Sequence, residues 1–397
     1  MRVAAITLAS LFVLSTAQPT NSPTSLQAAT HDQDTPEVRI QVLPKTVYLE
    51  QGENQYVNFD FLVENQTDKS LRLEAIRLLV LYANNKLVTR RFLDHNALSP
   101  SIHTLPQRQL PPKGSISIFN PFHTFPAGWP VAKLDYELVW ASETGEVQFR
   151  SQVGVRPVAY QTRTNLELPL EGRLLVYDGH DFYSHHRRID LTHPIARQLK
   201  MKFNPMLYAY DFCVTGPDGQ LYKNKGENLE EWFGFGAPVY APADGQVVDV
   251  VANIPDNILK DGRIHFGREL LLENPKSLAG NFVVMDHGNG EFSTISHLKH
   301  GSLKVKKGET VRKGQLIAEL GFSGDTGVHV HIHYQLQNGP DVFAAESLPA
   351  YFSNYRRIRG SRTFTVRRGP LDSGDLVEAM GSPEKRRKAA DGRAQVR

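Results

Sequence analysis

Cysteine is almost absent from this chain of 397 residues, because Cys213 is the only one. A single thiol excludes any intramolecular disulfide, so the fold cannot depend on covalent cross-links. A chain of this length can bury enough apolar surface to be stable without them. The share of hydrophobic residues is 40% and that of charged residues 22%, which is typical of globular proteins. Two domains are the default expectation for this length.

Long hydrophobic runs are also absent, except at the N-terminus, which reads MRVAAITLASLFVLSTAQ. Arg2 precedes an apolar run over residues 3–14, and small residues follow up to Ala17. This pattern predicts a signal peptide over residues 1–17, and therefore an exported protein, periplasmic or extracellular, without an integral membrane span after cleavage. The alternative is an uncleaved anchor helix, although the run is short for a bilayer.

A strong excess of charge is missing too, because the formal net charge is +3. The last fifteen residues, PEKRRKAADGRAQVR, contain six basic and two acidic side chains, so the rest of the chain has a net charge of −1. The sequence therefore gives no reason to expect nucleic-acid binding. Residues 356–397 are predicted to be a basic, disordered tail, and weak adhesion to an anionic envelope polymer is the alternative interpretation.

Short strands are indicated along much of the chain after a polar linker, residues 18–35, that is predicted to be disordered. Within residues 36–160, segments such as VRIQV, VNFDFLV and LDYELVW alternate apolar and polar side chains. About seven such strands predict a β-sandwich of immunoglobulin type. The segment LRLEAIRLLVLYANN could instead form a helix, which would weaken that prediction.

Residues 170–350 have a different pattern, in which glycine-rich turns separate strands and most of the histidines occur. NFVVMDHGNGEFSTISHL is typical of a hairpin with Gly288-Asn289-Gly290 as its turn. The predicted fold class is therefore all-β, with an immunoglobulin-like sandwich followed by a turn-rich antiparallel β domain.

Three histidines alternate with apolar residues in GVHVHIHYQL, residues 327–336. In a strand His329, His331 and His333 would lie on one face, with neighbours about 6.5–7 Å apart. Two imidazoles at that spacing can reach one Zn²⁺, which usually takes three protein ligands at a catalytic site. The spacing alone leaves a solvated, histidine-rich strand as an equal alternative.

Two further residues are candidates for a site. Asp211 interrupts an otherwise apolar or aromatic strand, residues 208–214, where an unpaired carboxylate would be costly, so it needs a cation or a metal as partner. His297 ends the second strand of the predicted hairpin, where a side chain can enter a cleft. His185, His186 and His287, taken singly, are more typical of structural roles.

Five motifs occur in the order found in the lysostaphin/LytM-type zinc endopeptidases, which cut peptidoglycan cross-links. They are SHHRR followed by YAYDF, then FGAPVYAPADGQVV, then VVMDHGNGEFSTISHL, and finally VKKGETVRKGQLIAELG running into GFSGDTGVHVHIH. The segment from about residue 178 to 337 resembles this family.

The resemblance implies a role for each matching residue. His186, Asp211 and His331 would hold one Zn²⁺ per chain, His329 would be the general base, and His297 would stabilise the anionic intermediate. His333 is interpreted as supporting structure. The long spacing between His186 and Asp211 departs from the usual pattern and leaves rival ligands, namely His185, His180 and His193.

The function implied is that of an exported zinc-dependent endopeptidase of envelope peptides, with peptidoglycan cross-links as substrate. The alternative is a catalytically inactive regulator that binds the cell wall. A lipoyl-type carrier is a third possibility, because KKGETVRKGQLIAELG resembles such half-barrels, but no suitable lysine is present at a hairpin tip. Whether a partner protein gates the site stays open.

Overall fold

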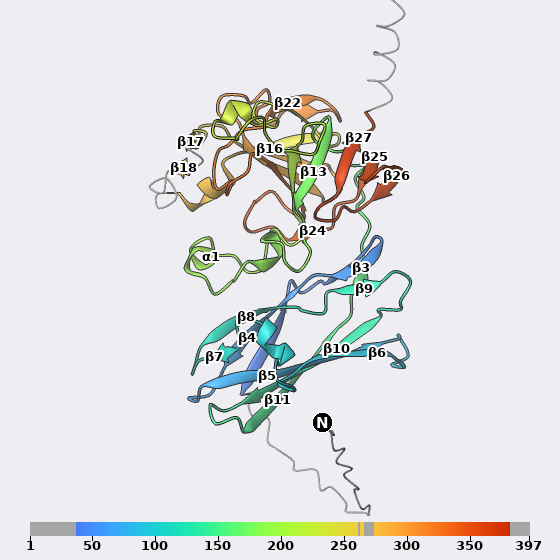
Figure 1. Ribbon diagram of the computed structural model, residues 1–397. Coiled ribbons are helices and arrows are strands. Elements are labelled where there is room, and N and C mark those ends of the chain that lie inside the picture. Colours follow the sequence, from blue (N-terminus) through green and yellow to red (C-terminus); the bar gives the residue numbers. More distant parts are fainter. Residues whose placement is uncertain (1–36, 261–262, 266–273, 382–397) are drawn as a thin grey trace, which may run out of the picture. The chain divides into compact units, whose positions relative to one another are not determined.

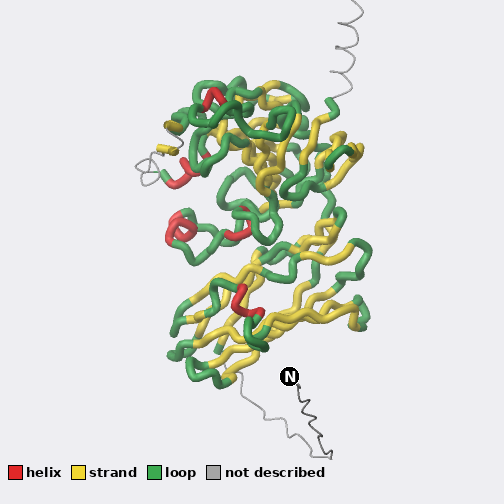
Figure 2. Tube along the Cα trace, in the orientation of Figure 1, coloured by secondary structure: helices red, strands yellow, loops and turns green. Residues whose placement is uncertain are grey.

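Strands are the main regular secondary structure of the described chain, and helices are few and short (Figure 2). The computed structural model describes residues 37–260, 263–265 and 274–381, and the predicted signal peptide and linker lie outside these residues. From Glu37 onward the described residues belong to one compact unit. We call residues 37–159 the N-terminal β region and residues 160–381 the C-terminal β region. No helix in the described ranges is long and apolar enough to cross a membrane.

The N-terminal β region consists of three sheets. The first has the order β1-β4-β8, the second β11-β10-β5-β6 with β7 beside β5, and the third β12-β2-β3-β9. The strands are β1 (Val38–Leu43), β2 (Tyr48–Gln51), β3 (Asn54–Val57), β4 (Asp60–Asn65), β5 (Leu71–Leu81), β6 (Leu87–Leu93), β7 (Gln109–Leu110), β8 (Ser115–Phe119), β9 (Thr124–Pro126), β10 (Lys133–Ala141), β11 (Val147–Val155) and β12 (Val158–Ala159), with a 3₁₀ turn η1 (Ser101–Thr104).

The alternation of apolar and polar residues in the sequence explains these strands. Along β10 the side chains of Leu134, Tyr136 and Leu138 are buried in one core, while residues between them are more exposed. The segment that could have been a helix forms β5, a strand paired with β10. It lies between two neighbouring strands and buries most of its apolar side chains in the sheet. The strand predicted over VNFDFLV is interrupted at Asn58 and Phe59, which separate β3 from β4.

The C-terminal β region contains one large sheet with the order β21-β16-β19-β20-β23-β14-β13-β27-β25-β26, and two small pairs, β15-β22 and β17-β18. Its strands are β13 (Arg173–Asp178), β14 (Tyr210–Val214), β15 (Pro238–Tyr240), β16 (Gly245–Val251), β17 (Ile258–Lys260), β18 (Arg263–His265), β19 (Asn281–Asp286), β20 (Phe292–Leu298), β21 (Thr310–Val311), β22 (Leu316–Glu319), β23 (Ile332–Gln337), β24 (Ser347–Leu348), β25 (Phe352–Arg359), β26 (Arg362–Gly369) and β27 (Leu376–Ala379).

Helices are short in this region. They are α1 (Pro194–Gln198) and the 3₁₀ turns η2 (His186–Arg188), η3 (Leu229–Glu231) and η4 (Pro275–Ala279). The predicted hairpin is present as β19 and β20, which pair antiparallel. A mostly β fold was therefore a correct prediction.

The prediction of a disordered tail from residue 356 is wrong for its first part. Strands β25, β26 and β27 extend the large sheet, and β27 pairs with β13 (Figure 1). The basic side chains concealed the pattern, because Tyr355 and Arg357 are both buried and alternate with exposed residues on β25. Residues 382–397 of the predicted tail lie outside the described residues.

Candidate metal centre

Three adjacent strands of the large sheet bring candidate residues together. β23 lies between β14 and β20, and the register places Asp211 opposite His333 on one side and Ser296 opposite His333 on the other. His297, the residue after Ser296, is consequently close to the same point. Asp211 and His333 are both buried, as expected for central strands covered on both faces.

His186 reaches this point from a different part of the chain. It begins the η2 turn after β13, and its side chain is fully buried. Its Nδ1 donates to the carbonyl oxygen of Gly179 at 3.1 Å, and its own carbonyl accepts a 2.6 Å hydrogen bond from the side chain of Asn204. These two contacts fix the imidazole with Nε2 directed at Asp211.

Three potential donor atoms form a nearly equilateral triangle. His333 Nδ1 is 3.1 Å from His186 Nε2 and 3.2 Å from Asp211 Oδ1, and His186 Nε2 is 3.3 Å from the same Oδ1. Donors held about 2.1 Å from one zinc ion in a tetrahedron lie about 3.4 Å apart. The triangle therefore fits three ligands of a tetrahedral zinc site with a fourth position open.

The outer hydrogen bonds of the two imidazoles support the same conclusion. His333 Nε2 lies 3.0 Å from the side-chain oxygen Oε1 of Gln335 and donates to it, just as His186 Nδ1 donates to a carbonyl. Each ring thereby donates its N–H proton on the side away from the triangle and directs a lone pair toward the centre of the triangle. This is the arrangement typical of metal-bound histidine. With both rings in this tautomer, two lone pairs and a carboxylate oxygen face one another and form a site for a cation.

The titration behaviour of these groups agrees with a site for a cation. Burial by itself would raise the pKa of Asp211, but the surrounding histidines, His186 foremost, hold that pKa well below its ordinary value. Burial lowers the pKa of the His186 imidazole. An ionised carboxylate beside an imidazole that burial keeps neutral, as for Asp211 and His186, is a donor pair that zinc prefers.

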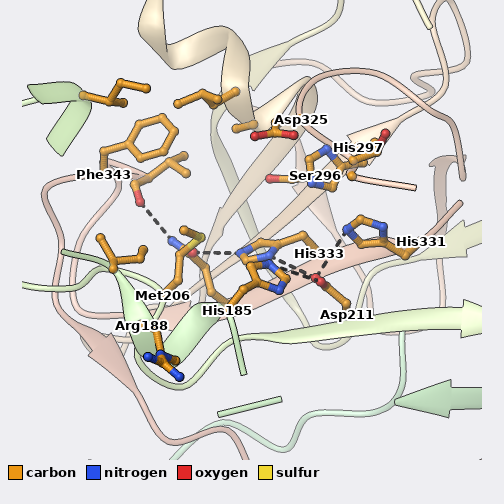
Figure 3. A pocket seen from close by; sticks show the side chains of 18 of the residues that line it. His185, Arg188, Met206, Asp211, Ser296, His297, Asp325, His331, His333 and Phe343 are labelled. Carbon is orange, nitrogen blue, oxygen red and sulfur yellow. Dashed lines mark hydrogen bonds and ion pairs between the residues drawn. The ribbon is translucent and has the colours of Figure 1, made fainter. Parts of the chain in front are cut away.

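His331 and His297 form a pair beside the triangle. Their ring centroids are 4.8 Å apart, and His331 Nε2 is 3.5 Å from Asp211 Oδ1 (Figure 3). His331 Nδ1 donates to the carbonyl of His329 at 3.0 Å, and His297 Nδ1 to that of Ser323 at 2.8 Å. In the neutral form of each ring, Nε2 is therefore the nitrogen that carries the free lone pair. Burial, followed by the neighbouring His331, holds the pKa of His297 well below its ordinary value.

His329 lies apart from this group. β23 begins only at Ile332, and the chain turns at Gly327, whose φ is +55°, so the predicted common face of three histidines does not extend to His329. Its ring packs on Tyr177 at a centroid distance of 3.9 Å and is 6.2 Å from that of Trp232. His329 lines the same pocket as the other histidines.

The rival histidines have different surroundings. His185 is exposed, contacts Asp178 through Nδ1, and has its Nε2 3.7 Å from Asp211 Oδ2. Asp178, His185, His186 and Asp211 thus offer a second combination of donors, all within 4.8 Å of one another. His180 is instead bound to Glu50, and His193 caps helix α1.

Two contributing residues escaped the sequence analysis. Asp178 ends strand β13 and contacts His185, and Gln335 orients His333. The position of Gln335 carried a signal, because a polar residue two places after His333 on a buried strand shares its face and can bond to its ring.

Asp211 and His333 line a pocket of about 660 Å³, whereas the fully buried His186 lies behind them and is not part of its lining. The histidines and Asp211 occupy one part of its lining, together with Ser296 and Asp325 (Figure 3). Apolar side chains line another part, and they are Leu199, Met201, Met206, Leu278, Ala279, Val342 and Phe343. An extended peptide could therefore meet the donor atoms and an apolar wall at the same time.

Comparison with known proteins assigns this region. Residues 232–343 match the model of Peptidase family M23. This segment belongs to that family. M23 peptidases depend on zinc. The matched residues include His297, His331 and His333 but neither His186 nor Asp211, which precede them, so the family match does not cover the first two corners of the donor triangle.

Two curated relatives from Vibrio cholerae are similar over part of this chain. Peptidoglycan DD-endopeptidase ShyB is 33% identical over 115 residues, which is 29% of this chain and 21% of the relative. Peptidoglycan DD-endopeptidase ShyA is 36% identical over 103 residues, 25% of this chain and 17% of the relative. The matched segment thus spans about a fifth of the length of these relatives.

Among solved structures, lysostaphin, an antimicrobial peptidase from Staphylococcus simulans, aligns with 56% of this chain and 85% of its own. The sequence identity is 14% and the TM-score 0.25. At that TM-score the alignment adds no conclusion about this chain.

Proposed function

We propose that this protein is a zinc-dependent endopeptidase with one Zn²⁺ per chain, held by His186, Asp211 and His333. The donor triangle, with edges of 3.1, 3.2 and 3.3 Å, is the observation that carries the proposal. His185 is the remaining rival ligand. We prefer His186, because it is fully buried and already oriented by a second hydrogen bond, whereas His185 is exposed and engaged with Asp178.

This proposal moves two roles by two residues along the chain. The family resemblance placed the third ligand at His331 and the general base at His329. The distances favour His333 as ligand, and His331 then takes the place next to the metal that a general base needs. His329, packed on Tyr177, becomes a residue of the pocket wall.

The residues divide the chemistry between them. Bound at this triangle, Zn²⁺ would supply Lewis acidity toward the scissile carbonyl and would lower the pKa of a water molecule to about 7. His331 would act as the general base through Nε2, since its Nδ1 is engaged with the His329 carbonyl. His297 lies beside His331 and is proposed to help stabilise the oxyanion that develops.

We propose peptidoglycan cross-links in the cell envelope as the substrate. Three observations support this choice: the ordered motifs, the similarity to two peptidoglycan endopeptidases, and the signal-like N-terminus, which implies export. The N-terminal β region is proposed to be an immunoglobulin-like β-sandwich. It would precede a peptidase domain that continues through β27.

Digestion of purified cell-wall sacculi tests the proposal, with mass spectrometry of the released muropeptides. The zinc-loaded protein should release peptides cut at one type of bond, and His331→Ala, prepared in the same way, should release none above background. Unchanged sacculi beside an active control enzyme would contradict the substrate. Failure of the wild-type protein to bind zinc at micromolar concentration would favour the inactive regulator instead.

A further inference from the structure

The segment that carries His186 is attached to the N-terminal β region by buried charged groups. Arg187, the next residue, has no exposed surface, and its guanidinium contacts the carboxylate of Asp60, which is also buried. A second nitrogen of Arg187 donates to the carbonyl of Phe59 at 2.6 Å. Asp60 begins β4 and Phe59 directly precedes it, more than a hundred residues earlier in the chain.

A second attachment lies a few residues before His186. His180 Nε2 is 2.6 Å from the carboxylate of Glu50 on β2, and the side chain of Asn58 donates to the His180 carbonyl at 3.3 Å. His180 and Glu50 are buried as well. The ligand segment is therefore fixed on both sides of His186, whose ring is oriented by the carbonyl of Gly179.

Burial makes the geometric effect of these contacts more important than their energy. An ion pair removed from water gains little net stability, because the loss of hydration offsets the attraction. It does fix the positions of its partners, since a guanidinium and a carboxylate meet in a narrow range of orientations. His186 and Arg187 are adjacent on one short turn, so fixing one side chain restricts the other.

We infer that Asp60 and Glu50 are positioning residues for the metal centre. They act through Arg187 and His180 and hold the segment that presents His186 to Asp211 and His333. The N-terminal β region is then a structural part of the metal site. This inference rests on the proposed metal centre and gives the region a role that its own residues did not indicate.

Metal affinity of folded variants tests the inference. Asp60→Asn removes one charge of the Arg187 pair and keeps the shape of the side chain. We expect its affinity for Co²⁺ or Zn²⁺ to fall about 10- to 100-fold, the range typical for loss of an outer-shell partner. We also expect the visible absorption of the Co²⁺ form to change, because that spectrum reports coordination geometry. Glu50→Gln should give a smaller change of the same kind.

A matched control is available in the same interface. Glu53, also in the N-terminal β region, pairs with Arg357 at 3.0 Å but contacts no residue of the ligand segment. Glu53→Gln should leave metal affinity within about twofold of the wild type. Equal losses in Asp60→Asn and Glu53→Gln would overturn the inference, as would wild-type affinity and spectrum in folded Asp60→Asn.

A second variant covers the case in which Asp60→Asn does not fold. Asp60→Leu combined with Arg187→Met replaces the pair by apolar side chains, which buried pairs often tolerate. Weakened metal binding by this folded double variant would support positioning by the ion pair, and wild-type binding would overturn it. Absence of metal from the wild-type protein would instead refute the metal centre itself, and the inference with it.

Discussion

In both β regions successive side chains of a strand alternate between its two faces, but the buried side chains differ in chemical type. In the N-terminal β region, β10 buries Leu134, Tyr136 and Leu138 in an apolar core. In the C-terminal β region, β23 is buried along its whole length, with Ile332, Tyr334 and Leu336 on one face and His333, Gln335 and Gln337 on the other.

The polar face of β23 persists in the interior because its members satisfy one another. His333 donates to Gln335, Gln335 donates to Gln337, and Asp211 and His186 complete the chain of contacts. Buried polar groups are tolerated only when they are partnered. The comparison teaches that the pattern which builds an ordinary core can also build a metal centre, provided that one face forms a closed polar network.

The sharpest test of the metal centre beside this polar face is the loss of the proposed general base, His331. His331→Ala should lower kcat by about 10²- to 10⁴-fold, the usual contribution of general acid–base catalysis, while zinc remains bound. His329→Ala is the matched control and should cost less than tenfold. Steady-state kinetics of both zinc-loaded variants measure this. A larger loss in His329→Ala would restore the roles implied by the family resemblance.

A substitution on the apolar face of β10 should have the opposite effect, lowering stability and leaving catalysis unchanged. Leu138→Ala, on β10, should lower the free energy of unfolding by about 2–5 kcal/mol through the cavity that it creates. The folded fraction should keep wild-type kcat and metal affinity. Denaturant titration and kinetics below the transition distinguish the two effects. A reduced kcat in the folded variant would break the contrast between the regions.

The partner of His333 provides a finer test. Gln335→Leu removes the acceptor of the His333 Nε2 proton, so zinc affinity should fall about 10- to 100-fold. Gln335→Glu keeps an acceptor at that position and should retain most of the affinity. Competition with a chelator measures both. Equal affinity in Gln335→Leu and the wild type would show that His333 needs no orientation by Gln335.

The smallest expected effect concerns His123 in the N-terminal β region. Burial lowers the pKa of this imidazole from 6.5 to about 4. Between these values the unfolded chain binds a proton that the folded chain does not, so stability is complete above pH 6.5 and is lost as the pH falls toward 4. The contribution is at most about 1.4 kcal/mol per pH unit.

His123→Phe should reduce that slope, because it cannot titrate and preserves the stacking with Phe182. Unfolding free energies measured from pH 4 to 7 provide the comparison. An unchanged slope would assign the acid sensitivity to other histidines, such as His186 and His297, whose pKa values are also lowered.

Alternation in the sequence was sufficient to predict the mostly β fold and the hairpin that ends in His297. It was insufficient for the tail, where Arg357 is buried against expectation because Asp375 and Glu53 neutralise it. The site depended on facts that a sequence pattern does not contain. β23 begins at Ile332, after His329 and His331, so the three histidines do not share one strand face, and the register with β14 places His333, rather than His331, opposite Asp211.

The identity of the third ligand is the central claim, and the zinc content of His333→Ala tests it most directly. Mass spectrometry under native conditions or elemental analysis of the purified protein gives the number of zinc ions per chain. The account predicts about one zinc in the wild type and in His331→Ala, and close to none in His333→Ala. Full zinc occupancy in His333→Ala, with loss in His331→Ala, would contradict it.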